Sequence, residues 1–132
     1  ANEKNNISLN YTLMNGQETN QNRVTTTDTI TYNYLLKRPK HTAGIQWSFQ
    51  PSPKLNVSIA ARYISKRYDV GGYAAEDVSL KSYTLLNAHV HYSINRHFIV
   101  YADGQNLGNK VFNEINGYNA MGRMLMLGLR IR

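Results

Sequence analysis

Apolar and polar residues alternate along six segments of the chain, and this period of two is the strongest pattern in the sequence. The segment at residues 5–14 places four apolar residues on one side of an extended chain: Ile7, Leu9, Tyr11 and Leu13. Successive side chains of a strand point to opposite faces, whereas a helix does not separate such a pattern. The alternation therefore predicts six strands, at residues 5–14, 41–50, 55–64, 82–93, 97–106 and 121–132.

The connections between these strands are alternately long and short. Two are tight turns at Pro51–Pro53 and Asn95–Arg96, and three are longer, at residues 15–39, 65–81 and 107–120. Outer-membrane barrels combine short periplasmic turns with long extracellular loops and strands of about 9–11 residues. The pattern therefore predicts three hairpins of a transmembrane antiparallel up-and-down β-barrel. Aromatic residues near strand ends are expected to form the interfacial girdle: Tyr11, Phe49, Tyr63, Tyr83 and Tyr92.

Alternation alone does not say which face looks inward, and a second class of protein stays open. A lipocalin-like barrel places its apolar side chains inside, around a ligand. A small self-contained β-barrel or a soluble ligand-binding β-domain is therefore the alternative. The asymmetry of the connections and the placement of the aromatic residues favour the membrane barrel.

Composition changes this picture little. Charged residues make up 17% of the 132 residues and aromatic residues 11%, ten of them Tyr. Cysteine is absent, which excludes a disulfide scaffold and cysteine-based metal or redox chemistry. The net charge of +7 comes without a long basic run or a phosphate-binding glycine loop, so we expect no nucleic-acid partner.

The polar positions of the predicted strands carry the candidate chemistry. His89 and His91 share one strand face, but a metal site needs further ligands, and none is visible nearby in sequence. A triad of Ser93, His91 and Asp103 can be written down, but the sequence alone gives no mutual geometry for it. No catalytic residue, no metal and no cofactor is predicted. These polar residues are expected to line the lumen or face a plug: Arg62, His89, His91, Asp103 and Arg130.

Basic residues gather at the predicted outer ends of the strands: Lys37, Arg38, Lys40, Lys66 and Arg67. Lysine and arginine pair well with phosphate, so lipopolysaccharide of the outer membrane is a candidate partner. Solvated loop charge is the equally weighted alternative.

Five segments resemble, in order and spacing, the motifs of one membrane-protein family. They are Arg38-Pro39-Lys40-His41, Tyr63 to Tyr68, Leu80 to Asn87, Gln105 to Lys110, and Gly117-Tyr118-Asn119 followed by Gly122-Arg123. Together they cover residues 38–132, and they resemble the C-terminal β-barrel region of TonB-dependent outer-membrane receptors. The last motif is most similar to cobalamin and ferric-siderophore receptors.

The resemblance implies a function and a set of partners. Residues 1–132 would be the C-terminal portion of a barrel of about 22 strands, with the plug domain absent from the chain. The receptor would sit in the bacterial outer membrane and take up a metal chelate (siderophore) or cobalamin, without being an enzyme. Its partners would be the remaining barrel and plug, the TonB complex through an N-terminal part, and outer-membrane lipid. Ligand contacts are expected from extracellular loops at Tyr68, Tyr73, Tyr118 and Arg123.

Two features depart from the family pattern. Members typically end on an aromatic residue, whereas this sequence stops at Arg132. The other strands, the plug and the TonB-binding segment are not in the sequence. Six strands do not close a barrel of that size, so two unpaired sheet edges and aggregation in isolation are expected.

Overall fold

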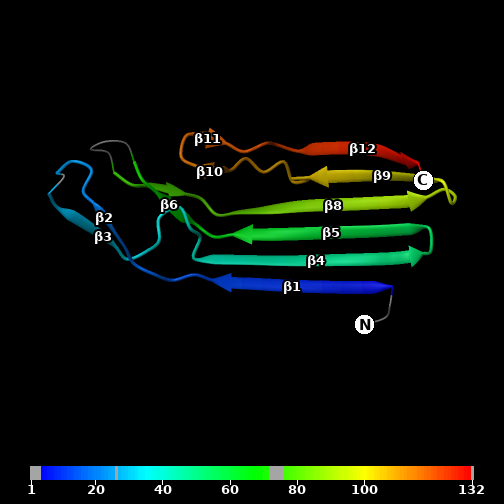
Figure 1. Cartoon of the computed structure of the whole chain (residues 1–132), viewed down its shortest axis with the longest axis horizontal. Coiled ribbons are helices and arrows are strands. Elements are labelled where there is room, and N and C mark those ends of the chain that lie inside the picture. The colour runs from blue at the N-terminus through cyan, green and yellow to red at the C-terminus, as the bar shows by residue number, and fades with distance from the viewer. Residues whose placement is uncertain (1–3, 26, 72–75, 132) are drawn as a thin grey trace.

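The main element is an antiparallel sheet of six strands (Figure 1). The computed structural model describes residues 4–25, 27–71 and 76–131. In this part of the chain the sheet contains β1 (Asn5–Leu13), β4 (His41–Ser52), β5 (Leu55–Ile64), β8 (Tyr83–Ser93), β9 (Phe98–Gln105) and β12 (Met124–Ile131). Each strand begins and ends within three residues of the bounds that alternation predicts. Neighbours in the sheet follow one another along the chain, in the order β1-β4-β5-β8-β9-β12.

The three long connections lie together at one end of the sheet, and the tight turns lie at the other (Figure 1). Each long connection contains a short hairpin: β2 (Glu18–Gln21) with β3 (Thr29–Tyr32), β6 (Arg67–Asp69) with β7 (Val78–Leu80), and β10 (Asn113–Ile115) with β11 (Tyr118–Asn119). The sequence predicts loops, without strands, at these three segments. Strands of two to four residues show too few alternations to stand out from a polar loop.

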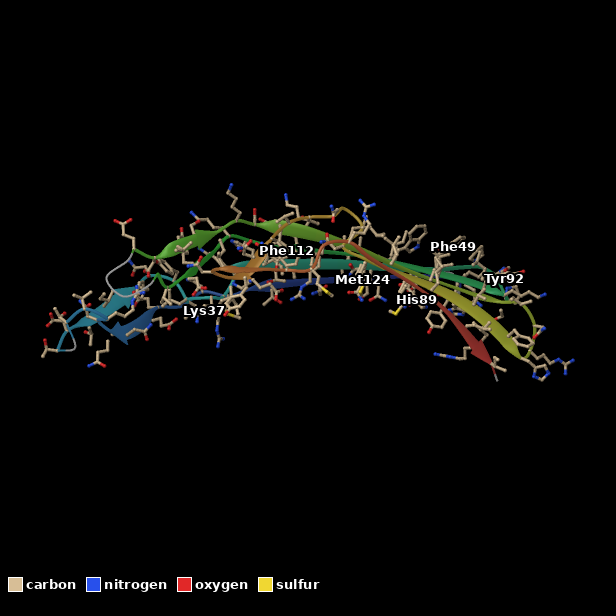
Figure 2. The ribbon with its side chains drawn as sticks, turned by 90° about the horizontal axis from the view of Figure 1, so that it is seen from above. Lys37, Phe49, His89, Tyr92, Phe112 and Met124 are labelled. Atoms are coloured by element: carbon tan, nitrogen blue, oxygen red, sulfur yellow. The ribbon has the colours of Figure 1, made fainter. Side chains whose placement is uncertain are left out.

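The register separates the sheet into one apolar and one polar face. Leu9, Ile45, Ala61 and Leu86 lie opposite one another on successive strands and therefore share a face. Ser58, His89 and Asp103 form a corresponding row on the other face. Figure 2 shows the sheet as an arch, with Phe49 on its convex side and His89 on its concave side. The apolar face is therefore convex, which is the reverse of a lipocalin-like barrel.

The sheet has no apolar core of its own. Leu9 and Leu127, on the convex face, are 74% and 84% exposed. The buried apolar residues lie instead where the strands meet the long connections, and they include Ile64, Leu80 and Tyr83. A contiguous apolar surface of this kind marks contact with lipid or protein rather than with water.

Tyr83 corrects one sequence expectation. It pairs with Ile64 on the polar side of the sheet, is 3% exposed, and stacks on Phe112 with a ring-centroid distance of 4.1 Å. It therefore does not belong to the interfacial girdle predicted for it. Tyr83 comes one residue before the position of β8 that pairs with Tyr63. Because successive side chains of a strand point to opposite faces, Tyr83 points away from the face that carries Tyr63.

Both edges of the sheet, β1 and β12, lack a neighbouring strand among the described residues. The sheet is thus open in the described part of the chain, as six strands of a wide barrel should be. The described residues also include no helix that is long and apolar enough to cross a membrane.

The two faces predict opposite effects for one substitution at adjacent positions of β12. Leu127→Arg places a charge on the convex face, where it costs about 2–4 kcal/mol at the middle of a bilayer. Met126→Arg is the matched control, because Met126 lies opposite Asp103 on the concave face. We expect Leu127→Arg, but not Met126→Arg, to reduce assembly of the complete barrel into outer membranes. Heat-modifiable electrophoretic migration measures assembly, and equal migration of both variants would contradict this assignment of faces.

Candidate functional site

A polar hollow lies on the concave face near the tight-turn end of the sheet. It has a volume of about 310 Å³ and is lined by His89, His91, Ile99, Tyr101, Asp103 and Arg130. The register of β8 and β9 brings His89 opposite Asp103, and Nδ1 of His89 lies 2.5 Å from Oδ1 of Asp103. Such a contact fixes the orientation of the imidazole ring. The centre of the His91 ring lies 6.0 Å from that of His89.

Tyr101 and Arg130 complete this hollow from the last two strands. Gly128 lies opposite Tyr101 across the β9–β12 pair, and a Cβ atom at Gly128 would collide with the tyrosine ring. Glycine therefore lets the ring lie across β12. Among the described residues, Arg130 has no carboxylate within ion-pair distance. A guanidinium beside two imidazoles is suited to bind a carboxylate from another part of the protein.

The five polar residues predicted for this side all lie on the concave face. Arg62 lies opposite Gly44 and Leu85, near the end of the sheet that carries the long connections. The other four line the hollow: His89, His91, Asp103 and Arg130. No group of three or more histidine, cysteine or acidic residues in the described part of the chain is placed to hold a metal ion.

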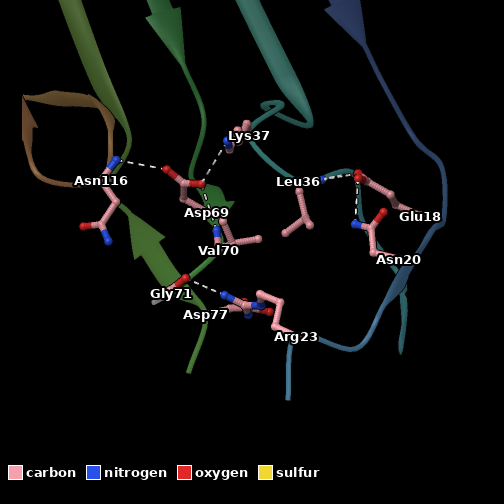
Figure 3. A network of polar contacts seen from close by, with 10 residues as sticks. All are labelled: Glu18, Asn20, Arg23, Leu36, Lys37, Asp69, Val70, Gly71, Asp77 and Asn116. Atoms are coloured by element: carbon pink, nitrogen blue, oxygen red, sulfur yellow. Dashed lines mark hydrogen bonds and ion pairs between the residues drawn. The ribbon is translucent and has the colours of Figure 1, made fainter. Parts of the chain in front are cut away.

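The three long connections form a second site, the loop cluster, which is centred on Asp69 (Figure 3). Asp69 is 2% exposed. Its carboxylate accepts hydrogen bonds from the backbone N–H groups of Val70, at 2.8 Å, and Asn116, at 2.9 Å. Nζ of Lys37 lies 3.9 Å from the same carboxylate. One buried charge therefore joins all three long connections, since these partners come from each of them.

Further polar contacts hold the first connection against the second (Figure 3). The guanidinium of Arg23 donates to the carbonyl of Gly71 and forms an ion pair of 2.8 Å with Asp77. The backbone N–H of Lys37 donates to the carbonyl of Tyr68 at 2.7 Å. These contacts join residues far apart in sequence, so the two connections are held against each other.

Glu18 fixes the path of the first connection back toward β4. Its carboxylate accepts hydrogen bonds from the side chain of Asn20 and the backbone N–H of Leu36, each at 2.9 Å. These two bonds, with that from Asn20 the larger cause, hold the pKa of Glu18 below its ordinary value. The stabilisation from Glu18 is therefore present above the ordinary pKa of a glutamate and is lost as the pH falls through the lowered value.

Arg67 and Tyr83 join the second connection to the third. Arg67 is 7% exposed, donates to the carbonyl of Asn113 at 2.9 Å, and lies 5.4 Å from the centre of the Tyr83 ring. The ring of Phe112, from the third connection, stacks on the ring of Tyr83. Arg67 was predicted to be one of the basic residues facing lipid phosphate or solvent. Its burial corrects that prediction, because its guanidinium is used inside the loop cluster.

The residues predicted to contact a ligand have different environments. Tyr68 stacks on Tyr34 with a ring-centroid distance of 4.3 Å and lines a hollow in the loop cluster. Tyr118 is 72% exposed in β11, and the backbone N–H of Arg123 donates to Asn109. Neither Tyr118 nor Arg123 lines the hollow of Tyr68. Tyr73 lies outside the described residues.

Sequence reasoning missed the residues that build the loop cluster. Asp69, Arg23 and Glu18 belong to segments without periodicity, and their partners are as many as 54 residues away in sequence. One signal was available. An isolated Asp between two aromatic or apolar residues, as in Tyr68-Asp69-Val70, is a candidate for a buried carboxylate that caps backbone donors.

The chain matches a family model over most of its length. Residues 5–107 match the model described as TonB dependent receptor-like, beta-barrel. No curated protein sequence matches the chain.

Solved structures of outer-membrane receptors resemble the chain in fold. The ferric-catecholate import receptor Fiu from E. coli K12, in its closed form, superposes with a TM-score of 0.75 at 18% identity, over 98% of this chain and 19% of its own. The siderophore receptor PiuA from Acinetobacter baumannii gives 0.75 at 23% identity, over 98% and 20%. The ferripyoverdine receptor of Pseudomonas aeruginosa gives 0.72 at 16% identity, over 97% and 17%. The chain thus spans about a fifth of the length of these receptors.

The central place of Asp69 predicts a local loss of order when its charge is removed. Asp69→Asn leaves a side chain of nearly the same shape but replaces one of the two accepting oxygens by an NH2 group. One charge-assisted hydrogen bond, worth roughly 1.5–3 kcal/mol, is therefore lost and the other is weakened. Asp28→Asn is the matched control, because Asp28 is exposed in the first connection. Hydrogen exchange measured by mass spectrometry should become faster in segments 67–71 and 113–119 of the Asp69 variant alone. Unchanged exchange there would show that Asp69 does not hold the connections together.

Proposed function

Because the chain belongs to the TonB dependent receptor-like β-barrel family, whose members are transport receptors of the bacterial outer membrane and not enzymes, we propose that it serves active uptake of a metal chelate. In this proposal residues 1–132 are the C-terminal portion of the receptor barrel. The chain supplies barrel wall and extracellular loops. The plug and the segment that binds the TonB complex belong to the rest of the receptor.

The observation that carries this proposal is the sheet with an exposed apolar convex face and a polar concave face. A bilayer is the environment that such a convex face requires, because burial of apolar surface contributes about 25 cal/mol per Å². The concave face then lines the lumen, where His89, Asp103 and Arg130 meet water or the plug. All three long connections lie at one end (Figure 1), which is the arrangement expected of extracellular loops.

The neighbouring structures support a metal chelate over cobalamin as the ligand. They are named as receptors for ferric catecholate, siderophore and ferripyoverdine. Cobalamin remains the second candidate within the same transport class. Ligand contacts are proposed for Tyr68, Tyr118 and Arg123, and also for Tyr73, which lies outside the described residues.

The competing hypothesis of a small self-contained or soluble β-domain finds no support in the geometry. Its apolar face would have to be concave and enclosed, whereas the exposed side chains of Leu9 and Leu127 lie on the convex face. The edge strands β1 and β12 are also not paired with each other in the described residues. In the proposed receptor, the remaining strands of the barrel cover both edges.

Energy-dependent uptake tests the proposed function directly. Cells that produce the complete receptor should accumulate an iron-loaded siderophore, and deletion of TonB should abolish accumulation while surface binding persists. Ferric catecholates, ferripyoverdine and cobalamin are compared as radiolabelled ligands in the same strain. Accumulation that is independent of TonB, or binding of none of these ligands, would contradict the proposal.

The polar hollow predicts a contact with the plug. Arg130→Gln removes the guanidinium from the lumen wall, and Arg96→Gln, at a tight turn, is the matched control. Loss of a charge-assisted hydrogen bond of about 1.5–3 kcal/mol should accelerate local opening of the plug by roughly tenfold or more. Hydrogen exchange of plug amides in the complete receptor measures this. Equal rates in both variants would mean that Arg130 faces only solvent.

A further inference from the structure

We propose that Asn116, at the tip of the third long connection, is a site of spontaneous deamidation, and that the reaction loosens the loop cluster. Asparagine followed by glycine is the pair most prone to this reaction, because glycine has no side chain to shield its main-chain nitrogen. The chain contains two such pairs, Asn15-Gly16 and Asn116-Gly117. Their surroundings differ, and the inference does not depend on the proposed function.

The tight turn between β10 and β11 is the reason for a glycine after Asn116. Asn116 and Gly117 form the two-residue connection in which Ile115 pairs with Tyr118. Gly117 has a φ of 85°, in the left-handed region where a residue with a Cβ atom is strained. The turn therefore requires glycine at this position. The same glycine makes the preceding asparagine reactive.

The two groups that react are exposed and unencumbered. Both Asn116 and Gly117 are exposed, and no atom beyond the chain neighbours lies within 4 Å of where a Cβ atom of Gly117 would be. Among the described residues, no group accepts a hydrogen bond from the N–H of Gly117. Figure 3 shows the side chain of Asn116 pointing away from Asp69. A cyclic intermediate and the attacking water therefore both have space.

The other pair, Asn15-Gly16, lies in more crowded surroundings. Gly16 is half-buried, and the side chain of Leu35 lies 3.1 Å from where a Cβ atom of Gly16 would be. The preceding residue is held as well, because the N–H of Met14 donates to the carbonyl of Lys40 at 2.9 Å. These contacts restrict both the rotation of Asn15 and the access of water. Asn15 should therefore react several-fold more slowly than Asn116.

The reaction needs only water as a co-reactant. The main-chain nitrogen of Gly117 loses its proton and forms a bond to Cγ of Asn116, while the bond from Cγ to Nδ2 breaks and ammonia leaves. Water then opens the cyclic imide. Cleavage of the new bond gives aspartate, whereas cleavage of the original peptide bond gives isoaspartate, in which the main chain runs through Cβ and Cγ. The sum is hydrolysis of an amide, without oxidation or reduction.

Either product disturbs the contact that holds the third connection. The backbone N–H of Asn116 donates to the buried carboxylate of Asp69 at 2.9 Å. Both products carry a negative charge on this same residue, and like charges that lie close together repel. Isoaspartate also lengthens the main chain within the two-residue turn that joins β10 to β11. The reaction therefore weakens the link between the second and third connections as the protein ages.

Peptide mapping by mass spectrometry tests the site in the complete receptor, aged in detergent at slightly alkaline pH. Incubation continues until a free peptide with the sequence of residues 113–119 has converted. We expect conversion of Asn116 in the receptor to be several-fold faster than conversion of Asn15, with aspartate and isoaspartate as products. Asn116→Gln is the matched control, because it keeps the amide and the main-chain N–H but would have to form a larger ring. Asn15→Gln should leave conversion of Asn116 unchanged.

Hydrogen exchange measures the consequence for the loop cluster. Exchange in segments 67–71 and 113–119 should become faster in proportion to the converted fraction, since the link between them is lost. Asn116→Asp should show faster exchange without ageing, and aged Asn116→Gln should not. Heat-modifiable migration verifies that each variant is assembled.

Three results would overturn the inference. They are an unconverted Asn116 in the receptor when the free peptide has converted, conversion of Asn15 as fast as that of Asn116, and unchanged exchange in receptor that has converted. The first would mean that the folded turn blocks the cyclisation. The last would mean that the contact between Asn116 and Asp69 tolerates the new charge.

Discussion

The whole structure depends on a sheet that has one apolar face and one polar face, and whose apolar face is not covered by another element of the described residues. The four inner strands satisfy their backbone hydrogen bonds through their neighbours, and only the outer edges of β1 and β12 are without a partner strand among the described residues. The side chains therefore decide what each face contacts. Leu9, Leu127 and their row mates project from the convex face, where water is an unfavourable solvent. In a bilayer the same surface is compatible with its surroundings, and the paired backbone meets the requirement that no polar group be left unsatisfied in hydrocarbon. The exposed apolar face is therefore expected to be stable in contact with lipid, in the barrel that the family model describes.

Order in the long connections has a different physical origin. It comes from a few buried polar groups that are shared between hairpins, above all the carboxylate of Asp69. A buried charge is costly unless it is fully hydrogen-bonded, so these contacts favour one arrangement of the three connections over many others. Within the loop cluster the rings of Tyr34 and Tyr68 stack on each other, and Nζ of Lys66 lies over the Tyr68 ring.

The sheet could be predicted from the sequence to within a few residues, while the loop cluster could not. Alternation is a local signal, and a row such as Ile7, Leu9 and Tyr11 reveals both the strand and its faces. Tyr83 shows the limit of that signal, because an aromatic residue at a strand end has the same appearance whether it faces lipid or the loop cluster. Asp69 shows a second limit, since its partners Lys37 and Asn116 are distant in sequence. The common face of polar residues such as His89 and Asp103 could be predicted from parity alone, whereas their 2.5 Å contact required the register.

The order of the strands in the sheet has a consequence for evolution. Each strand of the six-stranded sheet pairs only with the strands of that sheet that come directly before and after it along the chain, so a change in the length of one long connection leaves every pairing register of the sheet unchanged. The entropy of loop closure grows slowly with length, by about 0.6 kcal/mol for each doubling. Insertions and deletions between strands therefore cost little free energy, while a single-residue shift within a strand would exchange its convex and concave faces. The sheet can stay constant through long divergence while the connections at its end change in length and sequence.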